Sequence, residues 1–181
     1  MSSNTTKRGL VRSVRFVSLA AALTPLADGD LDEASRVTGV ALSKYFRTPE
    51  AIGLWRLRAI QVANDPDSAP WIARAAVAEP EDVVVGHAGF HGPPDSGGMV
   101  EVAYSVDPAY RRQGYATAML RELLRRAAAE PGVVTVRASI SPGNAGSLAT
   151  VARFGFAPNG EQWDEQDGVE LIFERPAERR A

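Results

Sequence analysis

The sequence predicts a single domain built on a mixed α/β sheet with helices on both faces. Helical patterns dominate residues 31–63, whereas strand-like and helical stretches alternate over residues 71–173. The length of 181 residues fits one domain. We expect this domain to span residues 10–176, after a disordered segment at 1–9 and before a loose tail at 177–181.

The first third of the chain is expected to hold one strand and two helices. Residues 14–19 read as a strand that enters a loop at Thr24-Pro25. Asp30 reads as a helix cap, and spaced apolar residues after it predict a helix over 31–42. Residues 49–63 predict a second helix. The basic residues before 16–23 also suit a signal peptide, so secretion is the alternative to a cytoplasmic location.

The rest of the chain predicts further strands and two more helices. Residues 99–106 show the clearest strand pattern, because Val100, Val102 and Tyr104 alternate with Glu101 and Ala103. The other expected strands are residues 71–77, 83–90 and 133–140, followed by an antiparallel pair around the turn at 164–168. The expected helices are residues 115–130 and a short helix between Asn144 and Phe154, with Gly155 after it.

The segment between the strand at 99–106 and the helix at 115–130 has the features of an anion site. Pro108 ends the strand, and Gly114 permits backbone angles that a side chain would hinder. The helix then begins with unpaired N–H groups at the positive end of its dipole, where phosphate commonly binds. Five arginines against one acid between residues 108 and 126 suit a polyanion, although they equally fit a solvated helix face.

Three ordered motifs resemble those of the GCN5-related N-acetyltransferase (GNAT) superfamily, with the ribosomal-protein N-terminal acetyltransferases as the closest branch. They are Arg111-Arg112-Gln113-Gly114-Tyr115-Ala116, the strand and turn at 101–108, and Asn144-Ala145-Gly146-Ser147 followed by Phe154-Gly155-Phe156. The resemblance implies a mixed, mostly antiparallel sheet of six to seven strands. It also implies acetyl-CoA as co-substrate, without a metal, and a cytoplasmic location.

The resemblance assigns coenzyme binding to two segments. The residues implied are Val106, Arg111, Arg112, Gln113, Gly114, Tyr115, Ala116, Thr117, Asn144 and Ser147. For Asn144, which follows a Pro-Gly pair, a plain turn residue is the alternative. The chain has no cysteine, which excludes thiolate nucleophiles and Cys-based zinc sites.

The resemblance also implies two catalytic residues. Glu101 is the candidate base for the attacking amine, with a solvent-facing strand charge as the alternative. Ser147 is the candidate acid for the departing thiolate or a ligand of the pantetheine arm, with a helix cap as the alternative. Many members of the family place a tyrosine where this chain has Val151. His87 and His91 could each act as a base, but a structural or substrate-lining role suits them better.

The function expected from the resemblance is acetyl transfer from acetyl-CoA to a primary amine, by direct attack in a ternary complex. The acceptor is a protein N-terminus, a lysine or a small amine, and a homodimer is compatible with it. A formal charge of −2 argues against a nucleic-acid partner, and no apolar run is long enough to suggest a membrane partner. The alternative is a non-catalytic acyl-CoA-binding sensor or interaction module.

Overall fold

In a computed structural model of the chain, residues 11–165 and 168–178 are described. The predicted disordered segment at 1–9 and the last three residues of the tail lie outside them. Ala177 donates its N–H to the Val134 carbonyl at 2.8 Å. None of the helices in the described ranges is both long and apolar enough to cross a membrane.

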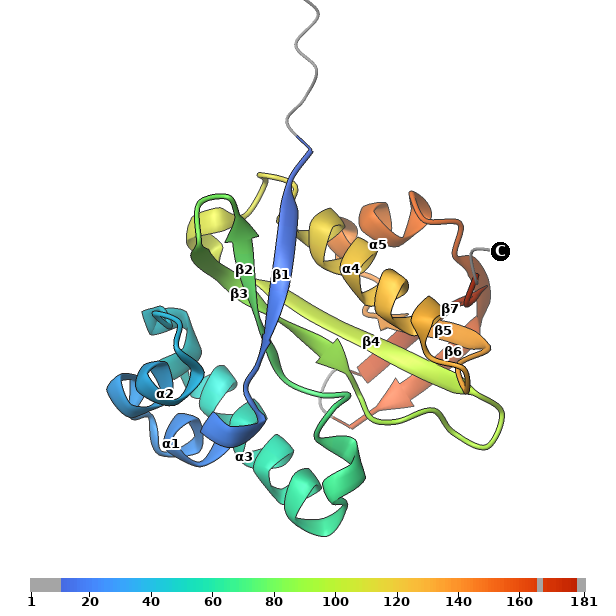
Figure 1. The fold of residues 1–181 in the computed structure, drawn as a ribbon. Coiled ribbons are helices and arrows are strands. Elements are labelled where there is room, and N and C mark those ends of the chain that lie inside the picture. The colour runs from blue at the N-terminus through green and yellow to red at the C-terminus, as the bar shows by residue number, and fades with distance from the viewer. Residues whose placement is uncertain (1–10, 166–167, 179–181) are drawn as a thin grey trace, which may run out of the picture.

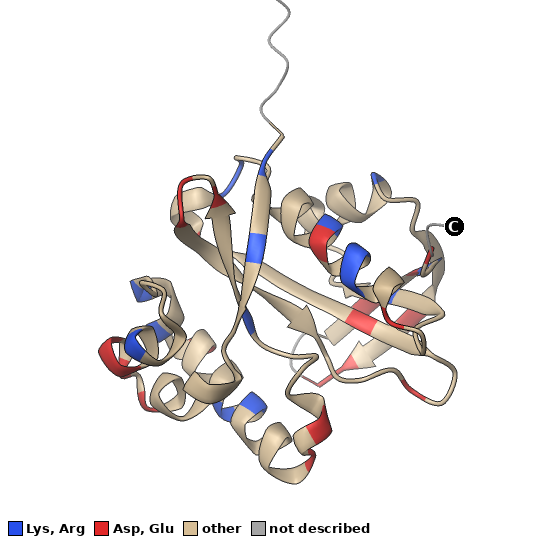
Figure 2. Ribbon diagram, in the orientation of Figure 1, with Lys and Arg blue, Asp and Glu red and all other residues tan. Residues whose placement is uncertain are grey.

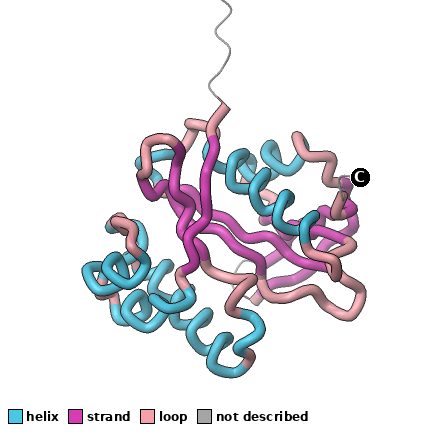
Figure 3. Tube along the Cα trace, viewed as in Figure 1, coloured by secondary structure: helices cyan, strands magenta, loops and turns pink. Residues whose placement is uncertain are grey.

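Seven strands of the described part of the chain form one sheet, in the order β1-β2-β3-β4-β5-β7-β6 (Figures 1 and 3). They are β1 (Ser13–Ser18), β2 (Arg74–Glu79), β3 (Val83–Phe90), β4 (Met99–Val106), β5 (Thr135–Ile140), β6 (Ala157–Asp164) and β7 (Gly168–Pro176). Every neighbouring pair is antiparallel except β4 and β5, which are parallel. The predicted mixed, mostly antiparallel sheet is therefore confirmed.

Helices cover both faces of the sheet, as predicted. On one side lie α1 (Leu23–Asp28), α2 (Leu31–Thr38) and α3 (Pro49–Asn64), and on the other α4 (Tyr115–Ala129) and α5 (Ala145–Ala152) (Figure 1). Short 3-10 helices are η1 (Ala20–Ala22), η2 (Lys44–Arg47), η3 (Pro66–Ser68) and η4 (Pro108–Tyr110). Each face has its own core: Met119, Leu120 and Leu123 of α4 anchor one, and Phe46 and Trp55 anchor the other.

Four predicted elements differ from the structure. Thr24 and Pro25 lie in helix α1 rather than in a loop, because proline is tolerated in a first turn where its missing N–H has no partner to lose. The helix predicted over 31–42 ends at Thr38, since Gly39 adopts a left-handed φ of 71° that closes it. Strands β2 and β5 begin three and two residues later than the predicted starts at 71 and 133.

The parallel strands β4 and β5 pair over a short distance only. Their register joins Met99 to Thr135, Val100 to Val136 and Glu101 to Arg137. Beyond Glu101, β4 continues beside β3 as far as Val106, while β5 continues beside β7. The second half of β4 therefore has an edge that faces β5 without the ladder of backbone hydrogen bonds that normally fills such an edge.

Charges of both signs lie close together on α4 (Figure 2). Arg125 forms an ion pair of 2.7 Å with Glu122, one turn away. Arg121 donates to the Arg12 carbonyl at 3.3 Å, which ties α4 to the start of β1. Arg121 and Arg125 therefore bind groups of the protein itself, as expected if the arginines of this helix form a solvated face.

Candidate active site

Asp107 fixes the turn that follows β4. Its carboxylate accepts from the Ala109 N–H at 3.0 Å and from the Ser43 hydroxyl at 2.6 Å, and its own N–H donates to the Val85 carbonyl at 2.9 Å. The residue is 7% exposed. A buried carboxylate with this many donors holds the exit of β4 rigidly against β3 and against the segment before η2.

The loop after this turn presents the start of α4 to solvent. Arg111, Arg112, Gln113 and Gly114 are exposed. Arg112 and Gly114 adopt left-handed φ angles of 62° and 91°, a conformation that glycine adopts without strain. Within residues 11–165 and 168–178, no side chain caps the N-terminus of α4. The first-turn N–H groups therefore point outward, in the arrangement that attracts anions.

Two polar side chains of this loop brace its backbone. The Arg111 Nε donates to the Val106 carbonyl at 3.2 Å, and the Gln113 Nε2 donates to the Ala109 carbonyl at 3.3 Å. Beside them, the Arg12 guanidinium lies over the buried Tyr115 ring in a cation–π contact, 5.1 Å from the ring centroid. Ala116 and Thr117 follow as half-buried residues of the first helical turn.

A cleft of about 430 Å³ lies where β4 and β5 separate. The residues that line it include Glu101, Tyr104, Ser139, Asn144, Ser147 and Glu170. The structure thus brings together three predicted site residues: Glu101 from β4, and Asn144 and Ser147 from the start of α5. The loop at 111–117 does not line this cleft and lies past the far end of β4.

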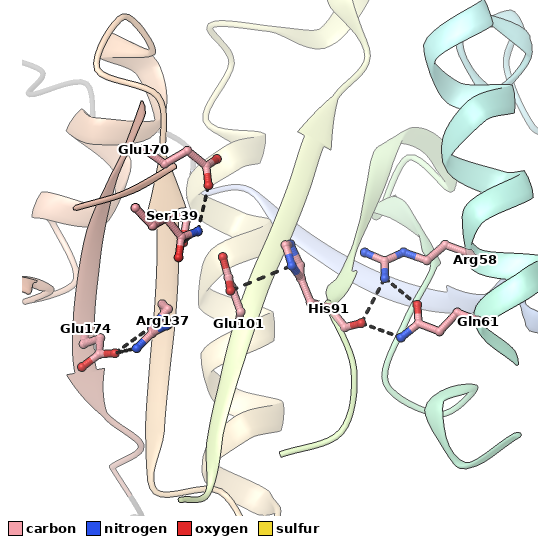
Figure 4. A network of polar contacts seen from close by, with 9 residues as sticks. Arg58, Gln61, His91, Glu101, Arg137, Ser139, Glu170 and Glu174 are labelled. Carbon is pink, nitrogen blue, oxygen red and sulfur yellow. Dashed lines mark hydrogen bonds and ion pairs between the residues drawn. The ribbon is translucent and has the colours of Figure 1, made fainter. Parts of the chain in front are cut away.

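Glu101 lies at the closed end of the cleft, beside His91 (Figure 4). Its side chain is 16% exposed, and its Oε2 is 3.9 Å from the Nδ1 of His91. The His91 N–H donates to the Glu101 carbonyl at 2.8 Å. From α3, Arg58 and Gln61 donate to the His91 carbonyl at 3.0 and 2.7 Å, so helix α3 fixes this corner of the cleft.

Partial burial in this corner lowers the pKa of His91 below its ordinary value. The carboxylate of Glu101 opposes that shift, Arg58 adds to it, and Glu170 and Asp164 oppose it with smaller effects. The net direction is downward, so we expect a neutral imidazole next to Glu101 at neutral pH.

On the opposite wall, the polar groups of β5 are held by its neighbours β6 and β7. Arg137, which is in register with Glu101, forms an ion pair of 2.6 Å with Glu174 of β7 (Figure 4). Gln162 donates to the Ser139 hydroxyl at 3.2 Å and to the Glu170 carboxylate at 3.0 Å. Arg137, the cationic side chain of β5 in register with Glu101, is thus paired with β7 rather than with Glu101.

The start of α5 settles which residue caps that helix. The Asn144 Oδ1 accepts from the Ser147 N–H at 3.1 Å, so Asn144 is the cap and the cap interpretation of Ser147 is wrong. The turn role expected as an alternative for Asn144 is real, yet it uses only the carboxamide oxygen, and the Nδ2 can still donate into the cleft. Val151 is 1% exposed in the core, and its aliphatic side chain can donate neither a hydrogen bond nor a proton.

Tyr104 is a cleft residue that the sequence analysis assigned only to a strand pattern. It lies on the face of β4 shared with Val102 and Val106, next to the core. Its Oη is buried and has no hydrogen-bond partner among the described residues. Burial raises the pKa of Tyr104, while the nearby hydroxyls of Ser147 and Thr150 oppose the shift without forming hydrogen bonds of ordinary geometry. The available sequence signal was that Tyr104, which carries a hydroxyl, occupies a strand face otherwise made of valines.

His87 lies outside the cleft, in an aromatic cluster. It stacks on Tyr45 with centroids 5.7 Å apart and meets Trp55 and Phe46 edge-on at 5.0 and 5.9 Å. Burial, with a smaller effect of Arg58, lowers the pKa of His87 to about 4. These contacts support the structural role that the sequence analysis favoured.

Sequence comparisons found a family model and a relative that match this chain. The model of the acetyltransferase (GNAT) domain matches residues 22–157. A Bacillus subtilis (strain 168) protein named uncharacterized N-acetyltransferase YjdG is 33% identical over 76 residues, or 42% of this chain and 45% of its own length. The aligned region thus spans about half of that relative.

Solved structures share the whole fold. The ribosomal-protein-S5-alanine acetyltransferase from Vibrio fischeri superimposes with a TM-score of 0.61 at 15% identity, covering 93% of this chain and 94% of the other. A GNAT-superfamily phosphinothricin acetyltransferase from Sinorhizobium meliloti, solved with AcCoA, gives 0.59 at 21% identity, covering 92% and 89%. At these identities the likeness establishes the fold.

Proposed function

Because the chain belongs to the acetyltransferase (GNAT) family, we propose that it transfers an acetyl group from acetyl-CoA to a primary amine. The observation that carries this proposal is the gap between β4 and β5. Glu101 lies at its closed end, and the uncapped N-terminus of α4 follows the other end of β4. A long ligand with an anionic middle and a reactive tip suits that arrangement.

We place the coenzyme along β4. Its pyrophosphate would accept from the N–H groups of residues 113–117, where Gln113 and Gly114 are exposed and no described side chain caps the helix. Its pantetheine arm would lie beside the half of β4 that lacks a β5 partner, and its amides would pair with backbone groups up to Val106. Asn144 would donate its Nδ2 to the same arm. A protein of the same fold has been solved with AcCoA, which supports acetyl-CoA as the co-substrate.

The catalytic step needs few catalytic groups from the protein, because a thioester is already activated toward attack by an amine. Alignment of the amine and the carbonyl is the main contribution, worth on the order of 7–11 kcal/mol in favourable cases. Glu101 would accept the amine proton directly or through a water, a role worth roughly 100- to 10,000-fold in rate. Backbone N–H groups on the free edge of β4 are suited to stabilising the oxyanion.

The acceptor would approach the corner formed by His91 and Glu101. Glu170 also lines the cleft, and a second carboxylate in the same cleft as Glu101 favours a cationic acceptor over an anionic one. A protein N-terminus, a lysine and a small amine all meet this requirement.

An acceptor screen tests the proposal. Wild-type protein is incubated with acetyl-CoA and a panel of peptides, lysine derivatives and small amines, and free thiol is measured. Amine-dependent thiol release supports the proposal. Coenzyme A binding by calorimetry without thiol release for any amine would instead support a non-catalytic binding module, and absence of both would overturn the family function for this chain.

A further inference from the structure

The phenol of Tyr104 belongs to a residue that lines the cleft, and the proposed function leaves it without a role. Its Oη has almost no contact with solvent and no hydrogen-bond partner in residues 11–165 and 168–178. A buried hydroxyl without a partner is disfavoured, and native proteins keep few of them. Such a group in a ligand cleft points to a partner that arrives with the ligand.

Tyr104 lies on the face of the sheet opposite to that of Glu101. The two residues are three apart on one strand, so their side chains leave opposite faces of the sheet. Glu101 meets His91 on the side of α3, whereas Tyr104 meets the Ser147 and Thr150 hydroxyls on the side of α5. Both line the gap that opens after Glu101.

We propose that Tyr104 donates the proton to the thiolate that leaves when the acetyl group is transferred. This proposal rests on the proposed function, since it concerns the same cleft and the same reaction. The C–N bond to the amine forms and the C–S bond breaks. The amine gives one proton to Glu101, and the sulfur takes one from the Tyr104 hydroxyl. Solvent then carries a proton from Glu101 back to the phenolate, so no other reactant is needed.

Neighbouring groups are less suited to this role. Val151 carries no proton, and Thr150 already donates its hydroxyl to the Gly146 carbonyl at 2.8 Å. Ser147 remains a neighbour that can stabilise a phenolate at Tyr104, and a serine hydroxyl is a much weaker acid than a phenol. Because burial raises the pKa of Tyr104, the phenol stays protonated at neutral pH.

Tyr104→Phe is the direct test, because it removes the hydroxyl and keeps the ring that packs against the core. We expect kcat to fall about 10- to 100-fold, with the KM for acetyl-CoA changed by less than about threefold. The thermal midpoint should stay the same or rise, since the lost hydroxyl had no partner in the free protein. Tyr110→Phe is the matched control: it removes the same group outside the cleft and should leave kcat within about twofold.

A binding measurement tests the sulfur contact without turnover. Wild-type protein should bind coenzyme A more tightly than desulfo-coenzyme A, and Tyr104→Phe should remove that difference. An unchanged kcat, a rise in KM alone, or equal discrimination between the two ligands by both proteins would each overturn the role of Tyr104. If wild-type protein binds coenzyme A through its sulfur but releases no thiol with any amine, the proposed function fails while the sulfur contact stands.

Discussion

The Nδ1 of His91 lies 3.9 Å from the Oε2 of Glu101, at the last residue of β4 that is in register with β5. His91 follows β3, and its carbonyl is held by Arg58 and Gln61 of α3. The corner therefore joins the sheet to the helical layer on one side of it. This placement gives Glu101 a fixed neighbour whose charge depends on pH.

Glu101→Gln should lower kcat by roughly 100- to 10,000-fold, because the amide cannot accept the proton of the attacking amine. The affinity for coenzyme A should stay within about twofold, since Glu101 lies away from the loop at 111–117. Thiol release and calorimetry measure the two quantities. Glu130→Gln, an exposed carboxylate at the end of α4, is the control. Unchanged turnover in Glu101→Gln would remove Glu101 from the mechanism.

Gly114→Ala should weaken coenzyme A binding at least about tenfold, because a side chain at φ 91° strains the turn and intrudes on the bound phosphate. Gly39→Ala supplies a matched control, since Gly39 has a similar φ of 71° at the end of α2 and open space around it. Both changes should lower the free energy of unfolding by about 1 kcal/mol. Equal coenzyme affinities in the two variants would show that the loop does not hold the phosphates.

His91→Asn should leave kcat within about threefold at about pH 8, because the lowered pKa of His91 keeps the wild-type imidazole neutral there. As the pH falls through that pKa, the wild type gains a positive charge beside Glu101 that repels a cationic acceptor. The acceptor KM should therefore rise more steeply in the wild type than in the variant. Steady-state kinetics from about pH 8 down through the pKa of His91 measure kcat and the acceptor KM. A large loss of kcat in the variant at about pH 8 would instead make His91 part of the base.

Protonation of His87 should destabilise the fold in acid. Its folded pKa is about 4, below the ordinary value of 6.5, so the unfolded chain binds the extra proton first. The free energy of unfolding should thus fall as the pH drops from about 6.5 to about 4, by about 1–3 kcal/mol after allowance for partial exposure. His87→Phe, which keeps a ring among Tyr45, Phe46 and Trp55, should lack this contribution. Denaturant unfolding of both proteins across that range gives the difference, and parallel pH curves would contradict it.

Much of the fold followed from the sequence because its strongest signals are local. The valine alternation of β4 and the apolar stripe of α4 predicted their elements within one residue. Helix α1 was missed since Pro25 reads as a loop residue unless its position in the first turn is known. The starts of β2 and β5 were placed early because β-branched and aromatic residues continue into the preceding turns.

The cleft was predictable only in part. Glu101, Asn144 and Ser147 stood out through their motif, and the structure gathers them around one gap. Tyr104 did not, and His91 was expected only as a structural or substrate-lining residue, since their contacts join residues distant in the sequence. The early end of the β4–β5 pairing has no local signal either, because it depends on where two strands far apart in the chain diverge.

Amide hydrogen exchange, resolved by residue with and without coenzyme A, is the most direct measurement of where the coenzyme lies. Coenzyme A should slow exchange at residues 113–117, which end the loop and begin α4, and along the half of β4 that faces the gap. A second hollow, of about 770 Å³, lies between α4 and β7 and is lined by Leu124 and Arg175. Protection confined to that hollow, or absent from the α4 N-terminus, would contradict the coenzyme site described above.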